Sequence, residues 1–256
     1  MRHAVLILAS GSIALAAQPI LADSHAGGVA NTQMVELITC DFVDGKDHSD
    51  LAAATEKWND WADDAGITDY SAWLMVPFYS SDNYDFDFAW LGSSSSAASL
   101  GRAQDTWLAS GGAVLDDFNA VMTCSGRSAF TVHEFKEPPE REDANNLMIT
   151  FSDCNLGEGT SFQDLSPSIH EWADYKGEND SSGGYWVLMP SMGGGGENFD
   201  FKWVTAYQNL ENLGKDIDQN RMGGWEKGRD LFTGKVSCDS SRVYTFTNQR
   251  WAEDDD

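Results

Sequence analysis

The sequence predicts an α+β protein made of two copies of one β-α-β-β-α-β unit, and three observations support this fold class. The four cysteines form two pairs with identical spacing, Cys40 with Cys124 and Cys154 with Cys238. Residues between the cysteines also correspond, and each half has the same order of strand and helix patterns. An internal repeat has to be identified first, because missing it would misassign the whole fold.

The correspondence between the halves extends well beyond the cysteines. Seven residues of the first half, Trp73, Pro77, Asp87, Phe88, Trp90, Leu100 and Gly101, recur as Trp186, Pro190, Asp200, Phe201, Trp203, Leu213 and Gly214. Each half has a normal length for one domain. The predicted divisions are a signal peptide at 1–26, a first repeat at 34–136, a linker at 137–146, a second repeat at 147–249 and an acidic tail at 250–256.

The first half opens with Met34–Cys40, whose composition predicts a strand. A helix follows, because apolar residues recur at helical spacing beyond Ser49 and Asp50, either of which suits an N-cap. Gly66 ends this predicted helix, since glycine readily adopts the left-handed conformation found there.

The rest of the first half alternates strand and helix signals. Ser71–Phe78 and Tyr84–Leu91 are predicted strands joined by a turn at Ser80–Asn83. The segment Ala97–Met122 is helical with a break at its Gly-Gly pair, and Ser128–Phe135 is the fourth strand.

The second half repeats this order. Its predicted strands are Met148–Phe151, Tyr185–Met189, Phe199–Val204 and Arg242–Asn248. One predicted helix carries Leu165 and Lys176 on a single face, and another runs from Leu210 to about Lys235 with a break at Gly223-Gly224. The glycine run Gly193–Gly196 reads as a flexible hairpin, because a strand follows it and not the helix that a phosphate-binding loop requires.

This element order is that of the ferredoxin-like, or split βαβ, unit. In that unit the fourth strand lies antiparallel to the first, so the end of one strand lies near the start of the other. The topology therefore predicts disulfides Cys40–Cys124 and Cys154–Cys238 among three possible pairings. The alternatives are four free thiols or a four-cysteine metal site, which would lack the usual Cys-x-x-Cys spacing.

The duplicated unit resembles the dimeric α+β-barrel superfamily in tandem form, over Met34–Asn248. The resemblance implies two sheets packed face to face as a pseudo-dimeric α+β barrel with the helices outside. Members of that superfamily include small monooxygenases of the antibiotic-biosynthesis type, haem-degrading enzymes and proteins of unknown role. The sequence contains no catalytic motif of these families that could be carried over, so the resemblance concerns the fold.

The N-terminus and the charge point to an exported protein. Arg2 and His3 precede an apolar run that ends in small residues, which is typical of a secretory signal peptide. We therefore expect a periplasmic or secreted protein without membrane insertion. The formal net charge of −25 disfavours nucleic acid as a partner, and the duplication predicts a monomer whose halves replace a dimer.

Strand alternation suggests a binding site between the two sheets. The third and fourth strands of each half have an aromatic face, which includes Phe88 and Phe130. If these faces pack against helices, the polar residues of the same strands face the space between the sheets. The expected ligand-binding residues are Asp87, Asp200, Thr131, His133 and Thr245. The alternative is that the two aspartates bond to neighbouring loops or face water.

No motif assigns a metal or a cofactor, so neither is expected. The acidic cluster near the first helix, Asp41, Asp44, Asp47, His48 and Asp50, misses the spacing of a calcium-binding EF-hand loop. The chain has no Gly-x-Ser-x-Gly elbow. The tryptophans at strand and helix spacing are expected in the core, with a stacking platform for ring compounds as the alternative.

Three functions remain open at this level. The first is a non-catalytic module that binds a small ligand or a protein partner between the sheets. The second is a structural or envelope-stress protein with a filled interior. The third is a cofactor-independent monooxygenase-like or haem-degrading enzyme, which the fold resemblance alone implies. The sequence favours the first of these, with the enzyme as the last choice.

Overall fold

A computed structural model of the chain describes residues 32–81, 86–137 and 147–253. The predicted signal peptide, nearly all of the predicted linker and the end of the predicted acidic tail lie outside these residues. Part of the predicted Ser80–Asn83 turn and the start of the predicted third strand lie outside them as well.

The described residues follow the predicted element order. The strands are β1 Thr32–Phe42, β2 Ser71–Tyr79, β3 Phe88–Ser94, β4 Met122–Lys136, β5 Leu147–Leu156, β6 Gly184–Met192, β7 Phe201–Tyr207, β8 Val236–Cys238 and β9 Arg242–Arg250. The helices are α1 His48–Asp64, α2 Ala97–Ser110, α3 Gly112–Asn119, α4 Phe162–Glu178, α5 Leu210–Gln219 and α6 Trp225–Phe232, with a π-helical turn, η1, at Asn220–Gly224 between the last two.

The strands form one closed antiparallel barrel. The strand order is β7-β6-β4-β1-β3-β2-β9-β5-β8, and pairing of β7 with β5 completes the ring. The two expected sheets are therefore continuous, because β4 pairs with β6 and β2 pairs with β9. This closure leaves no free edges between the sheets, which removes the exposed hydrogen-bonding groups that edge strands carry. The α+β-barrel part of the fold prediction is confirmed.

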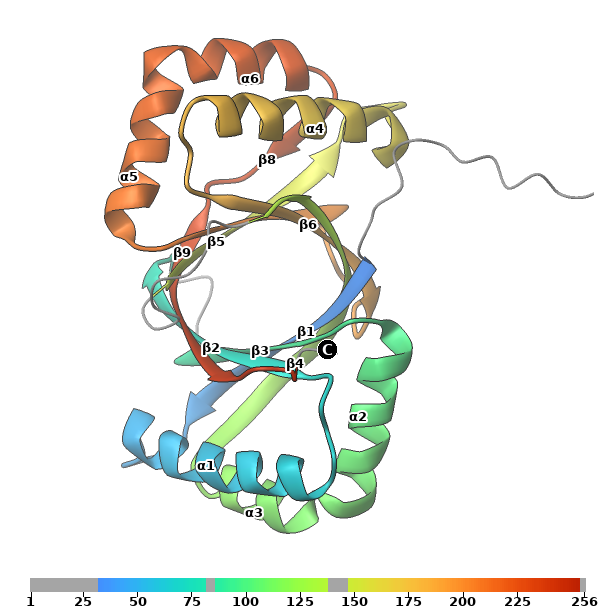
Figure 1. Ribbon diagram of the computed structural model, residues 1–256, viewed down its shortest axis with the longest axis vertical. Helices are drawn as coiled ribbons and strands as arrows, with labels where there is room; N and C mark the ends of the chain where they lie inside the picture. The colour runs from blue at the N-terminus through green and yellow to red at the C-terminus, as the bar shows by residue number, and fades with distance from the viewer. Residues whose placement is uncertain (1–31, 82–85, 138–146, 254–256) are drawn as a thin grey trace, which may run out of the picture.

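The helices form two layers on the outside of the barrel (Figure 1). Helices α1, α2 and α3 cover one side, and α4, α5 and α6 cover the opposite side. On the first side, Leu51 and Trp58 of α1 and Phe118 of α3 pack against Phe88 and Trp90 of β3. Burial of these large side chains provides most of the driving force for docking a helix layer on a sheet.

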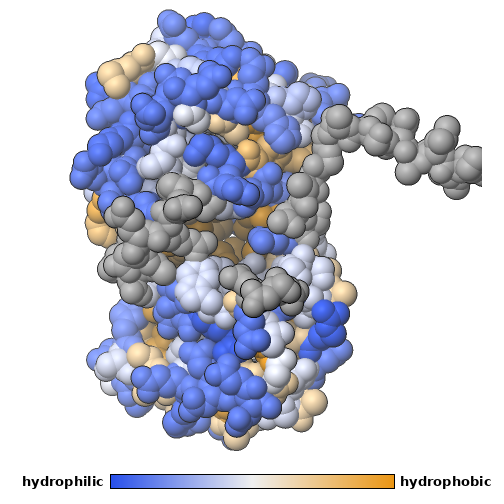
Figure 2. All heavy atoms as spheres, viewed as in Figure 1, coloured by the Kyte–Doolittle hydropathy of each residue, from blue (hydrophilic) through white to orange (hydrophobic). Residues whose placement is uncertain are grey.

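The barrel interior is a second, separate core. Its buried cluster contains strand residues from both halves and none from the helices, namely Val35, Met75, Ala89, Leu91, Phe130, Val132, Leu147, Ile149, Phe151, Leu188, Val204, Tyr244 and Phe246. Hydrophobic side chains are visible in the hollow between the two lobes (Figure 2). The expected orientation of the fourth strands is therefore wrong, because Phe130 and Tyr244 face the interior and not the helices.

Both predicted disulfides are present, Cys40–Cys124 and Cys154–Cys238. The first joins paired positions of β1 and β4, and the second joins paired positions of β5 and β8. Cys124 lies inside its ladder because β4 is longer than predicted and already begins at Met122, and Cys238 lies in β8, a short strand that was not predicted. Each bond closes a chain segment of 84 residues, so both constrain the unfolded chain to the same extent.

The first helix starts earlier than predicted. Asp47 is its N-cap, and its side chain accepts from the backbone N–H groups of Ser49 and Asp50. Asp50 occupies the third helical position and accepts from the backbone N–H of Asp47, which completes a capping box. Two members of the acidic cluster, Asp47 and Asp50, therefore cap a helix. No helix among the described residues is both long enough and apolar enough to span a bilayer.

Candidate functional site

A cavity of about 700 Å³ lies between the barrel and helices α1, α2 and α3, and we call it the helix-side cavity. Its floor comes from β1, β3 and β4, and its walls from the three helices. The lining residues are Glu36, Ile38, Cys40, Trp58, Trp61, Ile67, Tyr70, Trp90, Ala103, Gln104, Trp107, Leu115, Phe118, Asn119, Met122, Thr123, Cys124, Ser125, Gly126 and Arg127. Ligand sites are commonly apolar pockets of this size with a few converging polar groups.

Glu36 is the buried acid on the floor of this cavity, with 3 % of its surface exposed. Its Oε1 accepts from the Tyr70 hydroxyl at 2.7 Å and from Gln104 Nε2 at 2.8 Å. Its Oε2 accepts from Arg127 Nε at 2.8 Å and lies 2.7 Å from the Arg127 terminal nitrogen Nη2. Four donors therefore compensate a carboxylate that would otherwise be costly to bury.

Tyr70 is held as a hydrogen-bond donor. Burial first, and the neighbouring Glu36 charge second, raise the pKa of the Tyr70 hydroxyl well above its ordinary value. Trp90 Nε1 in turn donates to the Tyr70 oxygen at 3.3 Å. The hydroxyl can occupy this place only because β3 has glycine at position 92, where an added Cβ would lie 1.9 Å from that oxygen. Gly92 is thus required for the close approach.

Arg127 connects the buried carboxylate with solvent. Its side chain is 47 % exposed, whereas that of Glu36 is 4 % exposed. A guanidinium carries five N–H donors in a planar fork, and the bonds to Glu36 use two of them. The group is therefore positioned to present further donors to an anionic or carbonyl oxygen of a molecule in the cavity.

Four indole rings line the cavity. Trp58 and Trp90 meet edge to face with centroids 5.1 Å apart, and Trp61 and Trp107 do the same at 5.1 Å. The expectation that tryptophans lie in the core holds for Trp58 and Trp90, which are both buried. The four rings also line the cavity, which suits a planar apolar ligand.

The first part of β4 forms one side of the cavity floor. Every residue from Met122 to Arg127 lines it, and the Cys40–Cys124 disulfide anchors this segment to β1. The ladder between β1 and β4 shifts its register between Thr39 and Cys40, where Cys40 pairs with Cys124. The disulfide therefore fixes the strand that carries Arg127.

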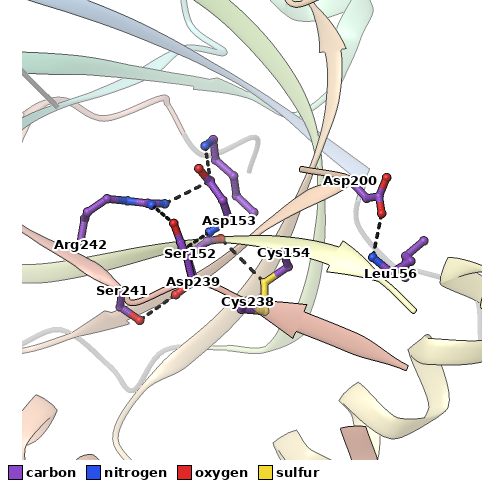
Figure 3. Close-up of a disulfide and its surroundings, with 10 residues drawn as sticks. Ser152, Asp153, Cys154, Leu156, Asp200, Cys238, Asp239, Ser241 and Arg242 are labelled. Atoms are coloured by element: carbon purple, nitrogen blue, oxygen red, sulfur yellow. Dashed lines mark hydrogen bonds and ion pairs between the residues drawn. A yellow bond between two sulfur atoms is a disulfide. The ribbon is translucent and has the colours of Figure 1, made fainter. Parts of the chain in front are cut away.

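The structure places the two predicted aspartates outside this cavity and at the surface. Asp87 and Asp200 are exposed, directly before β3 and β7. Asp87 accepts from the backbone N–H of Phe42 at 2.8 Å, and Asp200 accepts from that of Leu156 at 2.7 Å (Figure 3). These are bonds to neighbouring loops and strand ends, the alternative considered from the sequence.

The remaining predicted site residues are partly buried on β4 and β9. The Thr131 hydroxyl lies 2.8 Å from that of Ser191. The His133 ring packs 5.6 Å from that of Phe162, burial lowers its pKa, and its Nδ1 has no hydrogen-bond partner among the described residues. Thr245 is half-buried in β9. None of the five predicted residues lines the helix-side cavity or a smaller cavity inside the barrel, and ligand binding by them stays a prediction.

The group around Glu36 was missed by the sequence analysis. The available signal was an acid between apolar residues in the strand Met34–Cys40, a pattern typical of a buried charge with a partner. Its partners could not be found in the same way, because Tyr70, Gln104 and Arg127 are far from it along the chain.

Comparisons with known proteins identify the fold. No family model matches the sequence, and no curated protein matches it. Among solved structures, a candidate monooxygenase from Lactobacillus acidophilus NCFM has 10 % identity and a TM-score of 0.55, over 87 % of this chain and 96 % of its own. A haem-binding protein from Thermus thermophilus has 10 % identity and a TM-score of 0.50, over 86 % and 92 %. A mutant chlorite dismutase from Candidatus Nitrospira defluvii has 9 % identity and a TM-score of 0.52, over 85 % and 92 %.

These neighbours confirm the resemblance to the dimeric α+β-barrel superfamily at the level of the fold. They also correct the functional ranking. A non-catalytic binding module was the first expectation, and it is wrong, because the neighbouring structures are chlorite dismutase-like, haem-binding and monooxygenase-type proteins.

The helix-side cavity does not fit haem. Proteins hold haem iron with a histidine, a cysteine thiolate, a methionine paired with a histidine, or a tyrosine. The residues that line the cavity include no histidine. Both lining cysteines are joined in a disulfide, and the Tyr70 hydroxyl is committed to Glu36.

Proposed function

We propose that the protein is an enzyme of the cofactor-independent monooxygenase kind, acting on a planar, largely apolar small molecule in the helix-side cavity. The buried Glu36 carboxylate, bonded by Tyr70, Gln104 and Arg127 at the floor of this tryptophan-lined space, carries the proposal. A buried charge network that opens into a cavity is typical of an active site.

Arg127 is the proposed catalytic residue. A substrate with an acidic hydroxyl, such as a fused-ring phenol, would place its oxygen against the guanidinium. The positive charge favours the ionised form, so the proton passes to water at the solvent-facing side of Arg127. Glu36 is a positioning residue, because its two oxygens hold Arg127 and Tyr70 in fixed orientations.

The ionised substrate supplies the electrons for the oxidation, and dioxygen accepts them. One oxygen atom forms the new carbon–oxygen bond. The other leaves as water with two hydrogen atoms, both supplied by the substrate. The apolar walls formed by Trp58, Trp61, Trp90 and Trp107 admit dioxygen and exclude bulk water from the reacting carbon.

The wider organisation belongs to the same proposal. We infer that the halves at 34–136 and 147–249 are duplicated units that act as a pseudo-dimer within one chain, supported by their matching element order and disulfide positions. We also infer export to an oxidising compartment, since two disulfides without free cysteines among the described residues suit such a location. Light scattering that gives a stable dimer would contradict the monomeric pseudo-dimer.

Oxygen uptake tests the enzymatic proposal. The oxidised, full-length protein is incubated with 1-naphthol and larger fused-ring phenols in an oxygen-electrode cell. We expect Arg127→Gln to reduce turnover by about 10²–10³-fold, the usual cost of losing a donor to a developing oxyanion. The control is Arg229→Gln, an exposed arginine paired with Asp230, which retains activity. Equal turnover by Arg127→Gln and the parent protein would contradict the assignment.

Haem titration tests the competing function. His133, whose Nδ1 has no partner among the described residues, is the histidine that favours haem binding outside the helix-side cavity. We expect added haemin to give no Soret shift characteristic of a ligated iron. A shift that disappears in His133→Ala would favour haem binding over the proposed oxygenase.

A further inference from the structure

A second cavity lies inside one end of the barrel, and we call it the barrel cavity. Its volume is about 270 Å³, and its lining consists of Leu37, Thr39, Met75, Phe86, Ala89, Gly126, Arg127, Ser128, Phe130, Phe151, Gly193, Lys202, Arg242 and Tyr244. Strands of both halves contribute to it. Most of the barrel interior is packed with aliphatic and aromatic side chains, so charged residues at this end need a physical explanation.

Two cations enclosed at this cavity share one enclosed carboxylate. Asp153 Oδ1 lies 2.5 Å from Lys202 Nζ and 3.1 Å from the Arg242 terminal nitrogen Nη2. The side chains of these three residues are 16 %, 15 % and 6 % exposed. Arg242 also pairs with Asp239 at 2.6 Å (Figure 3), and the side chain of that aspartate is 46 % exposed. The two acids and two cations of this group balance formally, but the charged side chains that line the cavity itself are Arg127, Lys202 and Arg242, and no acid is among its lining residues.

Lys202 shows the energetic consequence. Burial lowers the pKa of its ammonium group even though Asp153 acts in the opposite direction. Its Nζ lies 3.9 Å from the centroid of the Phe199 ring, which is a cation–π contact. The charged form is thus incompletely compensated, and another anion near Nζ would stabilise it.

Aromatic rings also line the barrel cavity. Phe86 stacks with Tyr244 at a centroid distance of 6.2 Å, and Phe151 meets the same tyrosine edge to face at 5.8 Å. A void among such side chains costs packing energy unless something occupies it. The volume corresponds to about nine water molecules at their share of liquid volume, which is enough for a single ring with one small substituent.

We propose that the barrel cavity is a binding site for a small aromatic carboxylic acid, whose carboxylate bonds to Lys202 and Arg242 while its ring lies among Phe130, Phe151 and Tyr244. This site does not depend on the proposed oxygenase reaction. Glu36 lines only the helix-side cavity and Lys202 only the barrel cavity, whereas Gly126 and Arg127 of β4 line both.

Calorimetric titration with benzoate and phenylacetate tests the site, and benzamide is the neutral isostere. We expect saturable binding of the acids at least tenfold tighter than that of the amide, because a charged hydrogen bond is about twice as strong as a neutral one. Binding should also take up protons when the pH approaches the titration range of Lys202, since the carboxylate raises the lowered pKa of that ammonium group. Amide binding as tight as acid binding, or no saturable binding of the acids, would overturn the proposal.

The variant Lys202→Met localises the effect. It leaves Asp153 paired with Arg242 and retains the length of the side chain, and we expect it to reduce benzoate affinity at least tenfold. The control Lys227→Met removes a surface ammonium paired with Glu171 and should bind as the parent does. Glu36→Gln should lose turnover and retain benzoate binding, which separates this site from the proposed function. Should Lys202→Met fail to fold, the comparison of acid and amide on the parent protein decides.

Discussion

The two helix layers differ in what occupies the space between helix and barrel. In the sequence alignment of the halves, Ala62 corresponds to Lys176 and Ala103 to Asp216. The first half has small side chains at both places, and Ala103 lines the helix-side cavity. The second half has an ion pair, with Lys176 Nζ 2.8 Å from Asp216 Oδ1. The open first layer and the filled second layer thus differ at these two corresponding positions.

In the second layer, the larger side chains fill the space between helix and barrel, and hydrogen bonds hold them in place. Asp216 accepts from Ser181 at 2.6 Å, from Tyr185 at 3.2 Å and from Tyr207 at 3.0 Å. Lys176 is 1 % exposed and also donates to the side chain of Asn220 at 2.9 Å. A buried ion pair of this kind is stable only when such bonds satisfy the remaining donors and acceptors.

The contrast between the layers indicates which buried carboxylate belongs to a site. Glu36 and Asp216 are both enclosed and both accept several hydrogen bonds. The cation beside Glu36, Arg127, is half-exposed at a cavity, whereas the cation beside Asp216 is sealed in the core. Accessibility of the partner, rather than burial of the acid, distinguishes the half that we propose to be functional. Four experiments test whether the open and filled layers differ in this way.

Removing the disulfides one at a time should give the greatest losses of unfolding free energy. Each closes a segment of 84 residues, so Cys40→Ala with Cys124→Ala, and separately Cys154→Ala with Cys238→Ala, should each cost about 4–5 kcal/mol of unfolding free energy in the chain-entropy model. Only the first pair borders the helix-side cavity. Urea unfolding should therefore show similar losses of unfolding free energy in the two variants. Oxygen uptake under native conditions should fall only in the variant without Cys40 and Cys124. Retained uptake in both would contradict a functional difference between the layers.

Replacing Lys176 with methionine should cause the next largest loss of unfolding free energy. The change leaves Asp216 buried without its cation, and such losses cost about 3–5 kcal/mol. The matched control is Lys227→Met, whose partner Glu171 is exposed, with an expected cost under about 1 kcal/mol. Denaturant midpoints of both variants at neutral pH provide the measurement. Equal midpoints would mean that the second layer is not held by this pair.

The corresponding change in the first layer, Glu36→Gln, should disturb stability less and activity more. The amide retains hydrogen bonds to Tyr70 and Gln104, and Arg127 can turn to solvent, so we expect a loss of about 1–2 kcal/mol. Oxygen uptake should fall at least tenfold because Arg127 loses its fixed orientation. A stability loss as large as that of Lys176→Met would show that both carboxylates are purely structural.

The smallest expected effect is the contribution of His133 to the loss of folding stability at acidic pH. Burial lowers its pKa in the folded state, so the unfolded chain binds the proton first as the pH falls. The stability associated with neutral His133 is complete above about pH 6.5 and declines as the pH falls toward the lowered folded value. Across this window, the Tm should change less with pH in His133→Asn than in the parent protein. Identical slopes would contradict the assignment of the buried histidine.

Much of the fold could be predicted from the sequence because its signals are local or repeated. The element order and the neighbours β1 and β4 follow from periodicity and known topology, and the two disulfides follow from those neighbours. The face of β4 could not be predicted in this way. Phe130 and Ala129 point to opposite sides, yet both are buried, because the barrel interior and the helix layer are both apolar.

The site depended on contacts between distant segments. Glu36 meets Gln104 only when α2 docks on the barrel, and it meets Arg127 only in the register that pairs Ile38 with that arginine. A shift of one residue in that ladder would turn Arg127 to the other face of the sheet.

Composition, spacing and chain direction are properties of the sequence, and they were sufficient for the repeated pattern, the strand and helix order and the cysteine pairing. Three features emerged from the folded chain alone: the strand pairings that join the two sheets of the predicted barrel, the contrast between an open and a filled helix layer, and the choice of charges that meet. These features depend on burial and ion pairing, which are set by distances across the fold that sequence spacing does not specify.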